Sequence, residues 1–256
     1  MGSGMKMDSK MALQGRPVCL TIGGSDSCGG AGIQADLRTF AAMGVYGCSV
    51  ITALTAQNPR AITRIEPVSL AQLDAELHAI FDYFDVAAVK TGMLLDAEHI
   101  AVVSAVLQQH HRGALIVDPV MVASSGARLL DAGAVDTLVH ALLPLATMVT
   151  PNLDEAAVLL GETVTDQEEA ARRLAGRFGC AVLLKGGHAE ESDMLLDVLC
   201  DADGQLHRYR HARQPWGEVQ AHGTGCRLAS LVTAAMAAGL APEQAVAAAA
   251  ERFQGL

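Results

Sequence analysis

The chain has 256 residues, of which 51% are hydrophobic, and its formal net charge at pH 7 is −10. A chain of this length can bury one large core, and we expect a single domain over residues 17–256. Proteins that wrap nucleic acid or lie on anionic membranes need a basic face, whereas Lys and Arg together number only 18 here. Composition therefore argues against nucleic-acid and membrane partners, and any phosphate site must be local.

Six cysteines are scattered along the chain without the spacing of a zinc site or a disulfide framework. Residues 1–16 contain no apolar core like that of a signal peptide, and no later apolar run approaches membrane-spanning length. Together these features predict reduced thiols and a cytoplasmic location. We expect residues 1–16 to be a disordered segment, whose Met-Gly-Ser-Gly start could be a cloning remnant.

Residues 17–22 form the first predicted strand, which runs into a glycine-rich loop over 23–32 and a helix over 33–43. This order is typical of a ligand-binding loop. The run Gly-Ala-Gly-Ile-Gln-Ala at the start of the helix matches a dinucleotide-binding fingerprint. The next predicted strand, 48–56, does not end in the acidic residue that would hold a ribose, so we reject a dinucleotide site.

Strands and helices then alternate to the end of the chain. Ser69 with Gln72, and Thr165 with Glu168, predict capping boxes at two helix starts. Polar residues follow the strands, and the carboxyl ends of parallel strands meet at one edge of a sheet, so we expect these residues to converge. Further strands are expected at 86–89, 114–117, 147–149 and 180–184, a hairpin over 194–199 and 205–211, and helices at 97–109, 133–143 and 242–253.

Asn152 and Glu155 admit two interpretations. As structure they form a capping box, in which Asn152 is the N-cap and Glu155 reaches back to it. As chemistry, a carboxylate at a strand end could hold Mg²⁺ through water, since magnesium keeps several waters. Spacing alone favours the cap. Lys185, which two glycines follow, could likewise reach a transferring phosphate or simply be solvated.

A glycine-rich turn, Gly223-Thr224-Gly225-Cys226, opens directly into a helix whose apolar residues fall on one face. The first amides of a helix have no partner within it, and the helix dipole adds positive potential, so such a turn can bind phosphate oxygens. A thiol at Cys226 is expected to be easily deprotonated. The alternative is a tight turn with a Thr cap, and the turn taken by itself favours that alternative.

Short motifs stand in the same order as in a known family. They are Gly24 to Asp26, Gly29 to Asp36, Thr52 to Asn58, Val89 to Leu94, Asp118 to Met121, Thr150 to Glu155, Lys185 to His188, and His222 to Cys226. Taken together they resemble the hydroxymethylpyrimidine and hydroxymethylpyrimidine-phosphate kinases of thiamin biosynthesis, within the ribokinase-like superfamily. The likeness covers about residues 17–256, and Cys226 is specific, because most other ribokinase-like kinases have Asp there.

The resemblance implies an α/β fold, a three-layer α/β/α sandwich with a mostly parallel central sheet, and a homodimer. It implies ATP as phosphate donor, Mg²⁺ as cofactor and a small pyrimidine alcohol as acceptor, with the ATP site beside the last two helices. Glu155 would hold Mg²⁺ through water, and Thr150, Asn152 and Lys185 would contact nucleotide phosphates.

The resemblance also implies roles at the acceptor. Cys226 is similar to the catalytic residue of the family and would take the proton of the alcohol, while Lys185 is similar to its phosphate-binding, catalytic lysine. Gly223, Thr224, Gly225 and Cys226 would form an anion hole. The expected pyrimidine-binding residues are Gly24, Asp36 and Gln57, with Met93 and Val120 as pocket walls.

The sequence departs from the family pattern at several positions. Cys28 stands where Ser is usual, Thr91 where Ile is common, and Arg227 where a small hydroxyl residue often follows the cysteine. Arg227 could add a cation to the phosphate pocket or point to solvent. The loop 123–127 lacks the Lys and Asp often found there, and the last helix stops early, so the adenine pocket could be incomplete or finished by a neighbouring loop.

The expected reaction moves the γ-phosphoryl group of ATP to the alcohol of 4-amino-5-hydroxymethyl-2-methylpyrimidine, and then a second one to the monophosphate. A pyridoxine or pyridoxal kinase is the nearest alternative, but the Gln57 amide can pair with both a ring nitrogen and an amino group, which favours the aminopyrimidine. A vitamin-binding protein without catalysis would lack Lys185, Glu155 or Cys226, and all three are present. A Cys226/His222 hydrolase would need those side chains in hydrogen-bonding contact.

Overall fold

The computed structural model describes residues 15–122, 126, 129–131, 133–186, 194–213, 217 and 222–253. The predicted disorder of the N-terminal segment therefore lies outside the described residues, except for Gly15 and Arg16. The same holds for most of the loop 123–127 and for the end of the motif that Lys185 opens. None of the described helices is long and apolar enough to span a membrane.

Nine strands form one sheet in the described part of the chain. They are β1 (Val18–Asp26), β2 (Tyr46–Asn58), β3 (Ala61–Pro67), β4 (Val86–Thr91), β5 (Ala114–Val117), β6 (Met148–Val149), β7 (Ala181–Leu184), β8 (Met194–Cys200) and β9 (Leu206–Ala212). Their spatial order is β3-β2-β1-β4-β5-β6-β7-β8-β9. The six adjacent strands β2, β1, β4, β5, β6 and β7 run parallel to one another. The others are antiparallel to a neighbour: β3 to β2, β8 to β7, and β9 to β8. The mostly parallel central sheet is thus confirmed.

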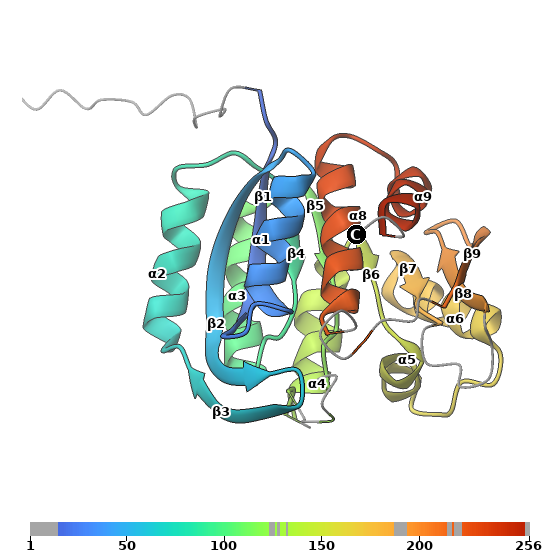
Figure 1. The fold of residues 1–256 in the computed structure, drawn as a ribbon, viewed down its shortest axis with the longest axis horizontal. Helices are drawn as coiled ribbons and strands as arrows, with labels where there is room; N and C mark the ends of the chain where they lie inside the picture. Colours follow the sequence, from blue (N-terminus) through green and yellow to red (C-terminus); the bar gives the residue numbers. More distant parts are fainter. Residues whose placement is uncertain are drawn as a thin grey trace, which may run out of the picture.

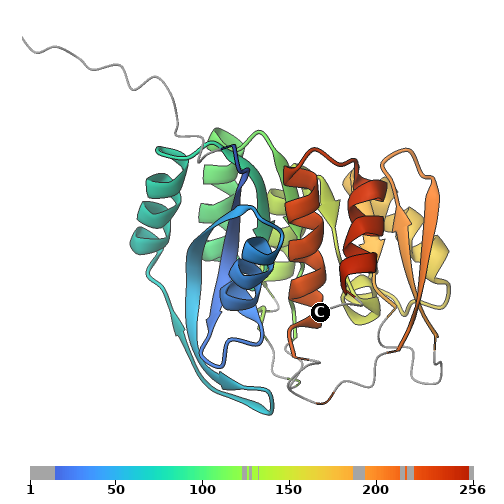
Figure 2. The same cartoon turned by 45° about the horizontal axis from the view of Figure 1, so that its top comes forward.

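Helices cover both faces of the sheet (Figures 1 and 2). They are α1 (Gly32–Ala42), α2 (Leu70–Phe81), α3 (Ala97–His110), α4 (Ala134–Thr137) continued by a π turn (Leu138–Leu142) and a 3-10 turn (Leu143–Leu145), α5 (Leu153–Leu160), α6 (Gln167–Phe178), α8 (Thr224–Ala237) and α9 (Pro242–Phe253). The core on one face is built from α2 to α6, and the core on the other from α1, α8 and α9. The three-layer sandwich is confirmed.

The two cores follow from the period of two along each strand. In β1, the side chains of Leu20 and Ile22 belong to the core on the α2 and α3 face. Cys19, between them in sequence, packs with Phe40 of α1 on the opposite face. Because β1 is apolar on both faces, it can lie only in the interior of a sheet that helices cover on both sides.

Some elements differ from the prediction for physical reasons. The strand β3 was not expected, because it is a sheet-edge strand with the charged side chains Arg64 and Glu66 exposed. Thr165 is not the N-cap of α6; the carboxylate of Asp166 accepts hydrogen bonds from the Glu168 and Glu169 amides instead. The helix expected at 133–143 is only partly α-helical, and Pro144 lies in the 3-10 turn that ends it.

The strand order reverses between β1 and β4, which are neighbours in the sheet. The strands that follow β1 in the chain, β2 and β3, extend the sheet to one side, and β4 to β9 extend it to the other. In an open parallel sheet, such a switch point leaves a crevice beyond the carboxyl ends of the strands, where ligands bind. A Cβ on Gly23 of β1 would lie 3.7 Å from the Met93 amide nitrogen, so the segments that follow β1 and β4 are close together. The fold thus places the glycine-rich loop that follows β1 next to the segment that follows β4, at this crevice.

Candidate active site

One cavity of about 830 Å³ opens at the carboxyl ends of the parallel strands. It is lined by almost every residue for which the sequence predicts a role, including residues far apart in the chain. Thr150 is the exception: it is buried beneath the cavity and donates to Asp118 Oδ1 at 3.2 Å. The predicted residues that line the cavity are Gly24, Asp36, Gln57, Met93, Val120, Asn152, Glu155, Lys185, Gly223, Thr224, Gly225 and Cys226.

The turn from Gly223 to Cys226, which is predicted to bind an anion and is called the anion loop below, forms the start of α8. Gly223 is the N-cap and has a φ of +78°, a backbone conformation that favours glycine. A Cβ there would lie 2.1 Å from the carbonyl oxygen of Gly30, so the loop packs directly on the segment that leads into α1. A Cβ on Gly225 would lie 3.3 Å from Lys185 Nζ, which places this ammonium group next to the first turn of α8.

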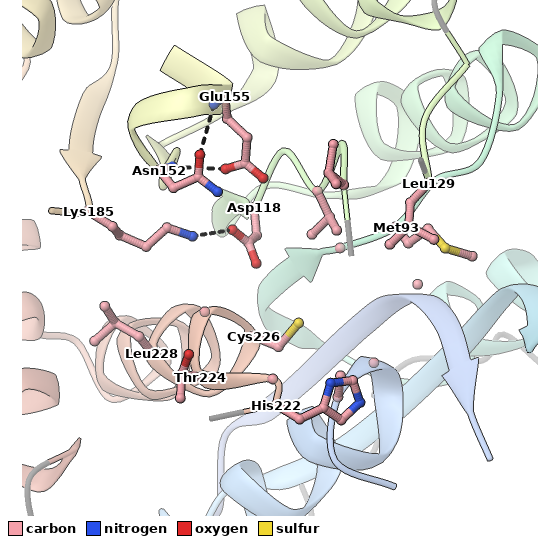
Figure 3. A pocket seen from close by; sticks show the side chains of 18 of the residues that line it. Met93, Asp118, Leu129, Asn152, Glu155, Lys185, His222, Thr224, Cys226 and Leu228 are labelled. Atoms are coloured by element: carbon pink, nitrogen blue, oxygen red, sulfur yellow. Dashed lines mark hydrogen bonds and ion pairs between the residues drawn. The ribbon is translucent and has the colours of Figure 1, made fainter. Parts of the chain in front are cut away.

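Lys185 and Asp118 form an ion pair at the ends of β7 and β5, with Lys185 Nζ donating to Asp118 Oδ1 at 2.8 Å (Figure 3). Burial opposes the charge on Lys185, but the neighbouring carboxylates of Asp118 and Glu155 raise its pKa. A β-bridge between the backbones of Lys185 and Asn152 fixes the position of the Lys185 backbone. The cavity therefore contains a permanent cation beside the free amides of α8, an arrangement suited to phosphate.

The Asn152 and Glu155 capping box is confirmed. Asn152 N donates to Glu155 Oε2 at 2.8 Å, and Glu155 N donates to Asn152 Oδ1 at 2.8 Å (Figure 3). Burial raises the pKa of Glu155 to about 7, with the negative charge of Asp118 adding to the effect and Lys185 opposing it. The cap thus holds a partly protonated carboxyl group at the cavity wall.

Asp36 is fully engaged by protein groups. Its carboxylate accepts from Thr21 Oγ1 at 2.6 Å, from Ser230 Oγ at 2.6 Å, and from Lys90 Nζ at 2.9 and 2.8 Å. A carboxylate has about four lone-pair sites, so direct contact with a pyrimidine would require one of these bonds to be exchanged. In this structure Asp36 serves as the partner of Lys90, a buried cation that sequence reasoning missed.

Cys226 lies in the first turn of α8, between Asp118 and His222 in the view of Figure 3. The expectation of an easily deprotonated thiol is wrong for this structure. Burial raises the pKa of Cys226, and Asp36 and Asp118 add to the effect, while Lys90 opposes it. The helix start alone therefore does not produce a thiolate, because desolvation outweighs it.

Gln57, Gly24 and Met93, which the sequence predicts to bind the acceptor, all line the cavity. A Cβ on Gly24 would lie 2.7 Å from Met93 Cε, so glycine leaves room for this side chain as a wall. Gln57 Nε2 lies 3.1 Å from His222 Nε2, and His222 Nε2 lies 2.9 Å from Asp26 Oδ2. Val120 is half-buried and also lines the cavity.

His222 does not support a hydrolase. Its Nε2 atom contacts Asp26 and Gln57, and its Nδ1 atom has no hydrogen-bond partner among the described residues. Cys226 is thus not paired with this imidazole, and the hydrolase interpretation loses its basis. Arg227, which follows the cysteine, does not line the cavity.

Sequence reasoning assigned no role to Asp118, Lys90 and Asp26. Each has a signal in the sequence, because a charged residue at the end of an apolar strand must be paired when it is buried. The partners could not be inferred, since they lie 67, 54 and 196 positions away. Among the described residues, Asp26, Cys28 and His222 form the one group of three donors close enough to share a metal ion, with ligand atoms within 4.8 Å.

Comparison with known proteins identifies relatives over most of the chain. Residues 26–255 match the family described as phosphomethylpyrimidine kinase. The chain is 46% identical to the hydroxymethylpyrimidine/phosphomethylpyrimidine kinase of Rhizobium meliloti, over 91% of this chain and 87% of that protein. It is 47% identical to the thiamine biosynthesis bifunctional protein ThiED of Geobacter sulfurreducens, over 89% of this chain and 46% of that protein.

Solved structures with a similar fold are kinases as well. A phosphomethylpyrimidine kinase from Clostridium difficile 630 is similar with a TM-score of 0.81 and 34% identity, over 94% of this chain and 99% of that one. A pyridoxal kinase from Staphylococcus aureus, solved with pyridoxal, is similar with a TM-score of 0.83 and 31% identity, over 93% and 87%. The expected ribokinase-like fold and kinase activity are confirmed, and the chain belongs to the phosphomethylpyrimidine kinase family.

Proposed function

We propose that this chain phosphorylates 4-amino-5-hydroxymethyl-2-methylpyrimidine with ATP, and then phosphorylates the monophosphate to the pyrophosphate, in thiamin biosynthesis. The observation that carries the proposal is the arrangement of one cavity. Met93 and Lys185 stand on opposite sides of it in Figure 3, Gln57 also lines it, and Cys226 lies in the first turn of α8, which is next to Lys185. A side-chain amide that can bind a heterocycle and a group of phosphate-binding residues line the same cavity, which suits phosphoryl transfer from ATP to a heterocyclic alcohol.

In the proposed reaction, the oxygen of the alcohol attacks the γ-phosphorus atom. The bond from this phosphorus to the bridging oxygen of ADP breaks, and ADP leaves with the electron pair. Lys185 and the amides of residues 223–226 balance the charge on the transferring group. Cys226 takes the proton of the alcohol as a thiolate. Burial raises the pKa of this thiol, so the thiolate is its minor form, which the nearby charge of Lys90 stabilises only in part.

The carboxylates near Lys185 fit a magnesium ion. When Glu155 is ionised, Asp118 and Glu155 together carry one more negative charge than Lys185 neutralises, and burial makes this excess costly. Mg²⁺ would balance it and would neutralise the donor phosphates when bound. Glu155 belongs to no group of three close ligands among the described residues, which suits an ion that keeps most of its waters.

The test is ADP release with ATP and Mg²⁺, with hydroxymethylpyrimidine, its monophosphate and pyridoxine as acceptors and chromatographic separation of the products. We expect turnover of the first two, ending in a pyrophosphate. Product formation from neither pyrimidine would contradict the proposal. In the same assay, a fall of less than about 10-fold in kcat for Cys226→Ala would remove Cys226 from the role of base.

The second candidate function is a pyridoxal kinase, because the Staphylococcus aureus neighbour was solved with pyridoxal. Turnover of pyridoxine alone would support it, keeping the phosphate site and changing the assignment of the acceptor side. No ADP release with any of the three acceptors would instead support a vitamin-binding protein of the same fold.

The resemblance also leads us to propose a homodimer in the cytoplasm. Light scattering coupled to size-exclusion chromatography would test the assembly, and cell fractionation the location. A monomeric mass at micromolar concentration, or recovery in a membrane or secreted fraction, would contradict the respective expectation.

A further inference from the structure

His222 joins the two sides of the cavity. It is buried, with 5% of its surface exposed, and it immediately precedes the anion loop. Its Nε2 atom lies 2.9 Å from Asp26 Oδ2 and 3.1 Å from Gln57 Nε2. A Cβ on Gly30 would lie 2.3 Å from His222 Cδ2, so the imidazole ring packs tightly on the loop after β1. The ring is therefore fixed in position next to Gln57.

The contact with Asp26 fixes the proton on this ring. Burial opposes ionisation, but hydrogen bonds from the backbone amides of Ala31 and Cys28 and from His222 hold the pKa of Asp26 below its usual value. An ionised carboxylate can only accept a hydrogen bond. Nε2 of His222 therefore carries its one proton, which lies between Asp26 and Gln57 and can be shared by two acceptors. An NH2 group of Gln57 on that side would face a second donor.

Thr55 constrains the other end of the same amide. Thr55 Oγ1 donates to the carbonyl oxygen of Ser25 at 2.9 Å and lies 3.1 Å from Gln57 Oε1. A hydroxyl group has one proton, so Thr55 is left as an acceptor towards Gln57. A half-turn of the terminal amide of Gln57 exchanges its oxygen and its NH2 group. Both contacts, with His222 and with Thr55, then become pairs of a donor and an acceptor.

We propose that His222 is a positioning residue that holds the carbonyl oxygen of the Gln57 amide towards itself and the NH2 group towards Thr55, and so selects a ring with an amino group beside a ring nitrogen. The inference deepens the proposed function and rests on it. Gln57 and His222 both line the cavity, and the amide keeps one lone pair and one N–H for a ligand.

The fixed orientation has a chemical consequence for selectivity. The free lone pair would accept from the amino group of the ring, and the free N–H would donate to the adjacent ring nitrogen. An amide that can turn over presents either order and loses this discrimination. A ring without the amino group leaves the half-buried Gln57 oxygen without a ligand partner, which lowers the affinity for that ring.

The test compares hydroxymethylpyrimidine with its analogue lacking the amino group, using wild type and His222→Phe, which keeps a ring but has no donor. We expect His222→Phe to raise the KM of the aminopyrimidine by about 10-fold or more and to reduce the preference over the analogue, with the KM of ATP unchanged. His222→Gln, whose NH2 group can donate, should restore the preference. In a Gln57→Ala background, His222→Phe should have no further effect. His140→Phe, at an exposed histidine, is the matched control.

Each other outcome is decisive. An unchanged preference in His222→Phe, or additive effects of His222→Phe and Gln57→Ala, would overturn the positioning role. If His222→Phe does not fold, Thr55→Val removes the acceptor at the other end of the amide, and an unchanged preference there would overturn it as well. Failure of wild type to phosphorylate either pyrimidine would instead overturn the proposed function, so the two failures are distinguishable.

Discussion

At the scale of single residues, Glu155 combines a helix cap with a buried acid. Burial raises its pKa from 4.5 to about 7. Between these two pH values, the folded protein holds a proton that the unfolded chain has released. The free energy of unfolding therefore decreases as pH rises through this window, because the folded state must then ionise a buried group. A cation bound near Glu155 would counteract the loss.

This reasoning predicts a pH-dependent stability that Glu155→Gln removes. Gln can still cap α5, so the variant separates the charge from the cap. We expect wild type to lose stability relative to the variant between about pH 5 and about pH 8, and excess Mg²⁺ to stabilise wild type at the higher pH only. Urea unfolding at both pH values, with and without Mg²⁺, measures this. The same pH slope in both proteins would contradict the role of Glu155.

At the scale of elements, local signals predicted most helices and strands well. The capping box of α5 lies within four residues, and the helix from Pro242 to Phe253 has the predicted ends. The N-cap of α6 was missed by one position, since Thr165 and Asp166 both suit a cap and the sequence does not rank them. Strand β3 was missed because an exposed edge lacks the apolar pattern of an interior strand.

The junction between the anion loop and the loop before α1 predicts the effect of two glycine substitutions. Gly223 (φ +78°) would place a Cβ 2.1 Å from Gly30 O, whereas Gly239 (φ +92°) has nothing within 4 Å of its Cβ. Gly239→Ala should cost only the backbone term, about 1 to 2 kcal/mol. Gly223→Ala should cost more and also raise the KM of ATP. Thermal unfolding and kinetics would measure both, and equal effects of the two substitutions would argue against the junction.

At the scale of the whole molecule, the buried pair of Lys90 and Asp36 links the sheet to the helix layer that contains α1 and α8. Lys90 is in β4, Asp36 in α1, and their partners Thr21 and Ser230 lie in β1 and α8. All four residues are at most 1% exposed. Ordering of this network therefore requires the sheet and the α1 and α8 layer to pack together.

Removing one partner of this pair predicts a large loss of stability. Lys90→Met leaves the Asp36 charge buried without its cation, so the free energy of unfolding should fall by about 3 to 5 kcal/mol. Arg64→Met breaks the exposed pair with Glu66 and should have a much smaller effect, because solvent screens this pair. Chemical denaturation of both variants is the measurement. A loss for Lys90→Met no larger than that for Arg64→Met would show that the pair does not stabilise the fold.

The order of the strands and the contacts within the site could not be predicted from local sequence. Polar residues at strand ends indicated one functional edge, and Gln57, Lys185 and Glu155 do line one cavity. Which of them touch depends on the reversal of strand order between β1 and β4, and periodicity carries no information about that reversal. The raised pKa of Cys226 was missed for the same reason, since burial comes from the packed whole rather than from the helix start.

The two edges of the sheet, β3 and β9, bear on the solubility of the protein. An edge strand has unpaired backbone groups that can recruit another strand and start aggregation. Exposed charged side chains stand on both: Arg64 and Glu66 on β3, and Arg208, which pairs with Glu168, on β9. Pairing of a strand from a second molecule with either edge strand would crowd or desolvate these charges. The charged side chains on β3 and β9 therefore oppose edge-to-edge association of two such sheets.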